Sequence, residues 1–313
     1  MEADKKRIRV LKRIFGEYNY SSKERLFHCP KCKHHKRKLS INLKKNVFKC
    51  WICDYSGRNI DRLVRRWGDI RDQREWLSYR PRVEISEFDK ILLNMTEEDQ
   101  EKIELPTEFI SLTKKSRDIE MLKARRYLNS RGIDYQDILK WKIGYCKTGE
   151  YKGRVIFPSF DEDGEVNYFV SRTYNNSWRT YKNPSCSKNK IIFNELYLDF
   201  NSDLVITEGV FDAIKAGPNA VPIMGSTISQ ESKLFWEIVR NDTPVYICLD
   251  KDAKEKELKI IEELLKYDVE VYRISLGAYK DLGEMEKETF KEKKEEAVLM
   301  TQESCMIERV NLL

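Results

Sequence analysis

The chain has 313 residues, about twice the length of a typical domain, so two or more folded units are expected. Its 41% hydrophobic and 35% charged residues, with a mean hydropathy of −0.64, are typical of a soluble protein with highly polar surfaces. No apolar run approaches the roughly 18 residues of a membrane span, and the first residues lack the apolar stretch of a signal peptide. We therefore expect a cytoplasmic protein that does not contact membranes.

Positive charge is concentrated at the amino-terminal end. Residues 1–80 hold 23 Lys and Arg against 9 Asp and Glu, a net charge of +14, whereas the rest of the chain carries −8. Clustered basic side chains gain affinity for polyanions by releasing counterions from phosphates, which predicts a nucleic-acid contact here. A lysine-rich soluble protein from an AT-rich genome is the alternative that charge alone leaves open.

Two cysteine pairs near the amino terminus have the spacing of a structural zinc site. They are CPKC and CWIC, separated by 17 residues, and their four thiols are Cys29, Cys32, Cys50 and Cys53. Four thiolates fill the tetrahedral coordination of zinc and leave no open position, so one structural Zn²⁺ is predicted. Two alternatives remain: a redox CxxC pair, or replacement of one cysteine ligand by His28, His34 or His35.

The residues around the cysteines predict a zinc-ribbon domain over residues 1–68. Residues 38–51 alternate like a β-hairpin around a KKN turn. Residues 56–68 predict a short helix, whose inward positions are Ile60, Leu63, Val64 and Trp67.

Basic and aromatic side chains are interleaved in this domain, as in proteins that bind unpaired bases. The candidate nucleic-acid contacts are Lys49, Trp51 and Arg58. Phe48 alternates with them, and we expect it to belong to the hydrophobic core.

The middle of the chain predicts a linker followed by a mixed unit. Residues 69–118 lack clear periodicity and are expected to be a linker with one or two helices. Two short helices broken at Gly132 follow, and residues 152–174 predict a hairpin around DEDG, with Gly164 in the turn. Arg154 and Arg172 flank this hairpin; their guanidinium groups suit phosphate binding, although a purely structural ribbon is the alternative.

From residue 203 onward the chain alternates strands and helices, which predicts a parallel α/β sheet. Four carboxylates follow the predicted strands: Glu208, Asp250, Asp252 and Asp281. Ligands of open parallel sheets bind at the carboxyl ends of the strands, so these acids are expected to converge. Clustered carboxylates repel unless a divalent cation lies between them, and oxygen ligands select Mg²⁺ or Mn²⁺. Such metals support phosphoryl transfer to a 3′-hydroxyl.

Several ordered segments match motifs of one family. They are SINLKKNVFKCWICDYSG, RVIFPSFDEDGEVNYFVSRTY, TYKNPS, VITEGVFDAI and LDKD. In them the chain resembles bacterial and phage DNA primases that combine a zinc ribbon with a TOPRIM domain, over about residues 10–285. The resemblance implies a mixed α/β fold, with a zinc ribbon, the amino-terminal part of a polymerase core over 119–202, a TOPRIM domain over 203–283, and a charged helix over 284–313.

The resemblance also implies roles for particular residues. Glu208, Asp212, Asp250 and Asp252 would be catalytic, and Mg²⁺ would be held by Glu208, Asp250, Asp252 and Asp281. Arg154, Arg172 and Lys182 would contact the nucleotide or the primer. Many family members have a second acid at the position of Gly283, for which Glu284 is the candidate substitute here.

These features lead to a functional hypothesis. The chain is expected to synthesise short RNA primers from ribonucleoside triphosphates on single-stranded DNA during replication. A TOPRIM nuclease and a non-enzymatic binding protein for single-stranded DNA are the alternatives. No Walker A sequence is present, so no helicase domain is expected, and the length suits a stand-alone phage or mobile-element primase acting in the host cytoplasm. The charged tail is the candidate docking segment for a replicative helicase.

Overall fold

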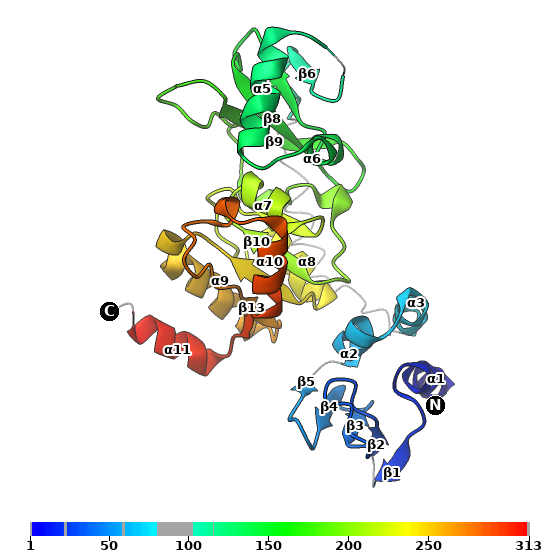
Figure 1. The fold of residues 1–313 in the computed structure, drawn as a ribbon. Helices are drawn as coiled ribbons and strands as arrows, with labels where there is room; N and C mark the ends of the chain where they lie inside the picture. The colour runs from blue at the N-terminus through cyan, green and yellow to red at the C-terminus, as the bar shows by residue number, and fades with distance from the viewer. Residues whose placement is uncertain (1, 22–23, 58–59, 80–102, 115, 312–313) are drawn as a thin grey trace. The chain divides into compact units, whose positions relative to one another are not determined.

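The computed structural model describes residues 2–21, 24–57, 60–79, 103–114 and 116–311. The chain divides into two compact units, Met1–Asp89 and Lys90–Leu313, which are described separately below (Figure 1). Within the described ranges, no helix combines the length and the apolar composition that a membrane span requires.

The first unit is a small antiparallel sheet covered by helices. Its strands follow one another in the order β1-β2-β3-β4-β5. The bounds are α1 (Glu2–Phe15), β1 (Asn19–Ser21), β2 (Glu24–Phe27), β3 (Leu39–Asn42), β4 (Val47–Cys50), β5 (Ser56–Gly57), α2 (Ile60–Trp67) and α3 (Ile70–Leu77). The predicted hairpin over 38–51 is confirmed as β3 and β4, which pair from Leu39 with Cys50 to Asn42 with Val47.

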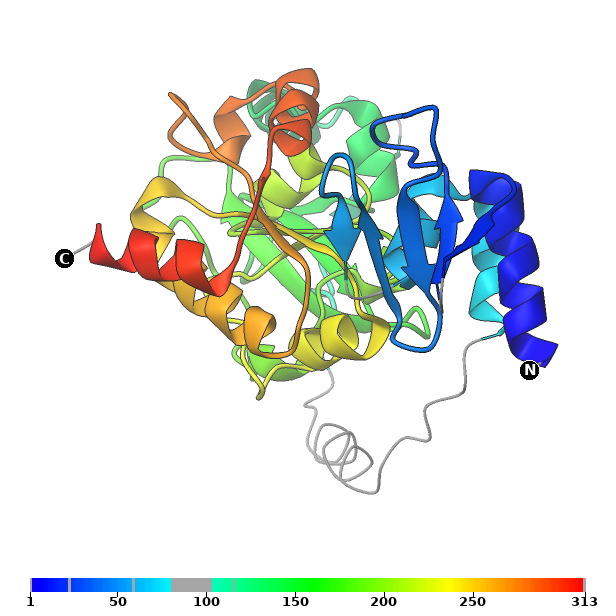
Figure 2. The same ribbon diagram turned by 90° about the horizontal axis from the view of Figure 1, so that it is seen from below.

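Apolar side chains from the helices and the sheet form the core of this unit. Val10 and Leu11 of α1 are fully buried, as are Ile60 and Leu63 of α2. Figure 2 shows α1 beside the strands. The prediction that Trp67 faces inward is wrong: it is 37% exposed. Trp67 is the last residue of α2, and its indole N–H donates to the Tyr55 hydroxyl at 3.2 Å instead of entering the core.

Helix α3 lies within residues 69–118, which the sequence predicts to be a linker with one or two helices, and it contacts α1 and α2. Asp69 caps its first turn by accepting a hydrogen bond from the Asp72 amide at 2.7 Å. The fully buried Trp76 anchors it to the core. This helix therefore belongs to the packing of the first unit.

The second unit begins with a four-stranded antiparallel sheet in the order β6-β7-β8-β9. The bounds are β6 (Phe109–Ser111), α5 (Ile119–Ser130), α6 (Tyr135–Lys140), β7 (Gly144–Cys146), β8 (Arg154–Phe160) and β9 (Val166–Thr173). The predicted helix break at Gly132 and the predicted hairpin turn at Gly164 are both confirmed. Gly132 separates α5 from α6 with a φ of +71°, and Gly164 turns the β8–β9 hairpin with a φ of +86°, a region that glycine adopts without strain.

A second sheet, in the order β11-β10-β12-β13-β14, completes this unit. The bounds are β10 (Leu204–Thr207), α7 (Val210–Ala216), β11 (Ala220–Pro222), α8 (Lys233–Asn241), β12 (Val245–Cys248), α9 (Lys254–Lys266) and β13 (Val271–Arg273), with short 3₁₀ turns at η1 (Lys188–Lys190), η2 (Glu195–Tyr197), η3 (Lys251–Ala253) and η4 (Leu282–Glu284). Strands β10 to β13 pair in parallel, which confirms the predicted α/β sheet.

One continuous hydrophobic core joins the two sheets of the second unit. Phe157 of β8 contacts Phe211 of α7 edge-on, with ring centroids 5.1 Å apart. The antiparallel hairpin is thereby fixed against the helix that follows β10. This packing positions the functional site, because side chains from both sheets line it.

The carboxyl-terminal part differs from the single charged helix predicted over 284–313. It consists of α10 (Lys287–Glu295), the short strand β14 (Val298–Leu299) and α11 (Gln302–Val310). Met285 and Phe290 are buried, whereas Val298 is 61% exposed. The helix stops at β14 because this strand pairs antiparallel with the edge of β13, whose backbone groups it satisfies.

Candidate functional site

The four cysteines of the first unit converge on one point. Their sulfur atoms all lie within 4.8 Å of one another, and the Sγ–Sγ distances are 3.8 Å for Cys29 to Cys53 and 3.9 Å for Cys32 to Cys50. A zinc ion with Zn–S bonds of about 2.3 Å places its ligands roughly 3.8 Å apart at the corners of a tetrahedron. The cluster contains no histidine. The residues therefore fit a structural zinc ion.

Basic and aromatic side chains lie on the same unit, near the zinc cluster. Trp51 is 60% exposed, and the Lys49 ammonium lies 5.2 Å from the centroid of its ring. Both line a shallow pocket of about 330 Å³ on the sheet. Phe48 is buried, as expected for a core residue. Arg58, the third candidate contact, lies outside the described residues.

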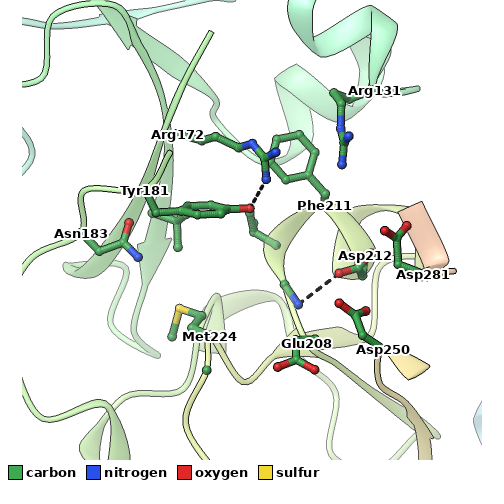
Figure 3. A pocket seen from close by; sticks show the side chains of 14 residues that line it. Arg131, Arg172, Tyr181, Asn183, Glu208, Phe211, Asp212, Met224, Asp250 and Asp281 are labelled. Carbon is green, nitrogen blue, oxygen red and sulfur yellow. Dashed lines mark hydrogen bonds between the residues drawn. The ribbon is translucent and has the colours of Figure 1, made fainter. Parts of the chain in front are cut away.

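In the second unit, four of the five candidate carboxylates line one pocket of about 500 Å³: Glu208, Asp212, Asp250 and Asp281. Figure 3 shows Asp212, Asp250 and Asp281 close together, with Glu208 on the same side of the pocket. Strands β10 and β12 are parallel neighbours, with Thr207 opposite Cys248. The residues just beyond these strand ends are therefore brought to the same edge of the sheet.

The fifth candidate carboxylate, Asp252, is exposed on η3 and does not line the pocket.

The residues around Asp281 bear on Gly283, the position at which many members of the resembled family have a second acid. Asp281 accepts a hydrogen bond from the Glu284 amide at 3.1 Å, and the Glu284 side chain accepts one from the Lys280 amide. A Cβ at Gly283 would lie 3.1 Å from Asp281 Oδ1 and 3.4 Å from Asp212 Oδ1. Gly283 therefore faces the acids, whereas Glu284 does not line the pocket.

Burial, together with mutual repulsion, raises the pKa values of two of the pocket acids, Asp212 and Asp250. Burial and the charges of Asp250 and Asp281 raise the pKa of Asp212 to about 7. Burial and the charges of Glu208, Asp281 and Asp252 raise the pKa of Asp250 to about 6. Such groups accept a proton or a cation readily, because either one relieves the repulsion.

Glu208 has an incomplete set of partners. Its Oε1 accepts a hydrogen bond from the Lys256 ammonium at 2.7 Å, while its Oε2 is buried and lacks a partner in the described structure. A buried carboxylate oxygen without a partner is costly, and a divalent cation would satisfy it. The acids thus fit Mg²⁺ or Mn²⁺ chemically, although among the described residues no carboxylate group is as compact as the four thiols.

The opposite wall of the pocket is basic and aromatic. Arg172 of β9 donates a hydrogen bond to the Tyr181 hydroxyl, and its guanidinium lies 4.8 Å from the Tyr181 ring centroid and 5.2 Å from that of Phe211. Arg131 and Asn183 also line the pocket. Figure 3 shows Arg172 and Arg131 across the pocket from the carboxylates.

Two of the three predicted nucleotide contacts, Arg154 and Lys182, do not line the pocket. Arg154 is buried and donates to the carbonyls of Thr180 at 3.0 Å and Arg179 at 2.6 Å, so it holds the segment that carries Tyr181. Lys182 forms an ion pair with Glu150 at 2.9 Å.

Tyr181 and Asn183 are not among the residues predicted from the sequence, although they lie in the TYKNPS motif. The segment pairs with β9: Arg172 and Tyr181 form a β-bridge, and the Lys182 amide donates to the Ser171 carbonyl. Alternate residues of an extended segment point to opposite sides, so Tyr181 and Asn183 face the pocket and Lys182 faces away. This alternation was the signal that could have identified them.

Comparisons with known proteins support the resemblance found in the sequence. No family model matches the chain. A DNA primase of Thermotoga maritima is 26% identical over an alignment of 291 residues that covers 76% of this chain and 50% of that protein. A DNA primase of Staphylococcus epidermidis is 24% identical over 175 residues, covering 50% of this chain and 29% of that protein. The chain thus spans half or less of the length of these relatives.

Solved structures show the same fold. The Aquifex aeolicus primase, in a structure of its zinc-binding and RNA polymerase domains, has a TM-score of 0.51 at 20% identity and covers 96% of this chain and 86% of that one. A structure of the DnaG primase catalytic domain bound to single-stranded DNA has a TM-score of 0.50 at 19% identity, covering 58% and 74%. The chain is similar in sequence to bacterial DNA primases and has a mixed α/β fold like their zinc-binding and polymerase domains, which confirms the predicted resemblance and fold class.

Proposed function

We propose that this protein is a DNA primase that synthesises short RNA primers from ribonucleoside triphosphates on single-stranded DNA, in the cytoplasm. One observation carries the proposal: a single pocket joins four carboxylates at the edge of a parallel sheet to Arg172 and Arg131 on the facing wall. Nucleotidyl transfer needs this pairing, because acids hold the metal and arginines bind phosphate. The likeness to primases in sequence and fold supports the same reaction.

Glu208, Asp250 and Asp281 would hold Mg²⁺ or Mn²⁺ in the region that resembles a TOPRIM domain, with Asp252 completing the set from η3. When bound, the metal activates the attacking 3′-hydroxyl and stabilises the pyrophosphate leaving group. Asp212 Oδ2 accepts a hydrogen bond from the Gly209 amide at 3.1 Å, so this carboxylate is held at the first turn of α7 beside the metal ligands.

On the facing wall, Arg172 would bind the triphosphate. Its guanidinium is held between the rings of Tyr181 and Phe211, which limits its freedom before the nucleotide arrives. Arg131 would add a second positive charge at the rim, and Asn183 offers an amide to the sugar or base. Arg154 would contribute by holding the 179–181 segment in place, and Lys182 would contact the primer outside the pocket.

The zinc ribbon would contact the template. Trp51 offers an exposed ring on which an unpaired base can stack, and Lys49 beside it can neutralise a phosphate. Arg58 would be a third contact to the nucleic acid, as the sequence predicts. The solved structure of a DnaG catalytic domain with single-stranded DNA supports a single-stranded template.

A replicative helicase is the partner proposed for the carboxyl-terminal segment. Three apolar side chains of α11 are more than 60% exposed: Met306, Ile307 and Val310. Deleting the whole tail would also remove Met285 and Phe290 from the core. Replacing the three exposed residues by Ser is therefore the more specific change. If a replicative helicase then stimulates primer synthesis as much as it does with the unmodified protein, the docking role of α11 is contradicted.

The experiment that tests the function is primer synthesis by the purified, zinc-loaded protein. The reaction contains mixed-sequence single-stranded DNA, labelled ribonucleotides and Mg²⁺ or Mn²⁺, and the products are resolved on a denaturing gel. Short products with a fixed 5′ start would support a primase. Cleavage of the DNA without synthesis would point to a nuclease, and DNA binding without either activity to an accessory protein.

A further inference from the structure

Lys256 is a cation paired with one of the pocket carboxylates; it does not itself line the pocket and does not belong to the predicted machinery. It lies in the first turn of α9, the helix that follows Asp250 and Asp252. Its ammonium lies 2.7 Å from Glu208 Oε1, and both side chains are largely shielded from solvent, with 29% and 25% exposed. The ion pair is therefore screened less than one on the open surface.

This contact occupies an atom that a divalent cation would use. Of the two carboxylate oxygens of Glu208, Oε1 is bound to Lys256, and the buried Oε2 alone lacks a partner in the described structure. The ammonium thus offsets part of the negative charge that attracts a metal.

We propose that Lys256 is a positioning residue that weakens divalent-cation binding at the carboxylates, by holding Glu208 Oε1 and placing a positive charge beside the ligands. The inference rests on the proposed function, because it takes these acids as the metal site. A cation that enters must share Glu208 with the ammonium or displace it. The metal is consequently held loosely and exchanges readily with solution.

The same helix supplies a matched control. Lys259 lies one turn further along α9 and pairs with Glu255 at 2.8 Å, but both side chains are exposed, at 59% and 75%. Replacing Lys259 by Met removes the same charge from the same helix, together with an ion pair inside that helix, away from the pocket. Tighter Mn²⁺ binding in K256M alone therefore reports the position of the charge and not the loss of a lysine from α9.

The experiment is calorimetric titration of Mn²⁺ into the zinc-loaded protein without nucleotide. We expect K256M to bind Mn²⁺ roughly tenfold more tightly than the unmodified protein, because one repelling charge is gone. K259M should match the unmodified protein, and K256R, which keeps the charge, should stay within about twofold of it. Circular dichroism verifies that each variant is folded. Unchanged or weaker Mn²⁺ binding in K256M overturns the proposal.

A further variant separates this proposal from the assignment of the metal site. If D250N abolishes Mn²⁺ binding while K256M fails to tighten it, the carboxylate site stands and only the role of Lys256 is refuted. If D250N leaves Mn²⁺ binding unchanged, the metal assignment under the proposed function fails, and the role of Lys256 fails with it.

Discussion

The cysteine cluster and the carboxylate pocket are two kinds of candidate metal site in one chain, and they are built in opposite ways. The four thiols come from two turns within residues 29–53 and already lie at tetrahedral spacing. The acids come from separate elements between residues 208 and 281, and burial together with mutual repulsion raises the pKa values of Asp212 and Asp250. A structural site uses all four ligands to hold its ion and the fold around it, whereas a catalytic site retains unbalanced charge for its ligands.

The largest expected effect comes from breaking the cysteine cluster. In C50S the zinc ion loses one ligand, and because structural zinc supplies on the order of 10 kcal/mol of folding free energy, the first unit should unfold. Zinc content and the dispersion of backbone NMR signals measure this. The second unit should keep its own signals, since its core is separate.

The matched control is C186S, which replaces a half-buried thiol in the second unit, outside the cluster. It should retain zinc and leave the first unit folded. A folded, zinc-containing first unit in C50S would contradict the structural role of the cluster.

In the carboxylate pocket, a substitution is expected to reduce activity without reducing stability. D250N removes a candidate metal ligand, so primer synthesis should fall at least about a hundredfold. The melting temperature should not decrease, because the substitution also removes one of the repelling charges. The control is D163N in the exposed β8–β9 turn. Synthesis retained by D250N would refute the catalytic assignment.

The charge of the carboxylate pocket should make the stability of the protein depend on pH through Asp212. The folded-state pKa of Asp212, about 7, lies above its value in an unfolded chain, so the folded state binds more protons between about pH 4 and pH 7. The free-energy cost of holding Asp212 charged in the folded state is absent below that pH range and grows as the pH rises through it. Without divalent cations, D212N should therefore gain stability over the unmodified protein, by on the order of 2 kcal/mol at pH 8 and by almost nothing at pH 4.

Urea unfolding at several pH values measures this difference, and added Mg²⁺ should reduce it by stabilising the charged carboxylates. A gap between D212N and the unmodified protein that does not change with pH would show that the folded state does not destabilise the charged form of Asp212.

The contrast between the sites also explains what the sequence could predict. The cysteine spacing identified the cluster, because CxxC turns fix the geometry locally. The strand pattern brought Glu208 and Asp250 together, because neighbouring parallel strands end at one edge. Phe211 was missed because it enters the pocket through tertiary packing between separate elements, whereas Tyr181 was missed although the alternation of its extended segment could have identified it. The hydrogen bonds by which Arg154 holds the 179–181 segment could not be predicted for a similar reason, because its carbonyl partners lie 25 and 26 residues away.

The tail illustrates a second limit. A run of charged residues predicted one helix to the end of the chain, and local propensity does favour helix over Lys287–Glu295. The open edge of β13 captures Val298 and Leu299 as a strand. Such pairing depends on a partner that is distant in sequence, so no local pattern reveals it.

A smaller effect is expected on the exposed face of the first unit. W51A removes the ring proposed to stack on a template base, so affinity for single-stranded DNA should fall about tenfold while zinc stays bound. The neighbouring Ile52 is 48% exposed, and I52A serves as the control. Fluorescence anisotropy of a labelled oligonucleotide measures both. An equal loss in I52A would show that exposed apolar area, and not stacking, accounts for binding.

The smallest effect is expected from one hydroxyl in the pocket. Y181F keeps the ring beside the Arg172 guanidinium but removes the acceptor of its hydrogen bond. Loss of one such bond costs about 1 kcal/mol, so KM for the nucleotide should rise about fivefold while kcat changes little. Y197F, at a half-exposed tyrosine outside the pocket, should match the unmodified protein. If Y181F leaves KM unchanged and Y181A raises it, the ring alone positions Arg172, and the preorganisation of the basic wall comes from stacking without the hydrogen bond.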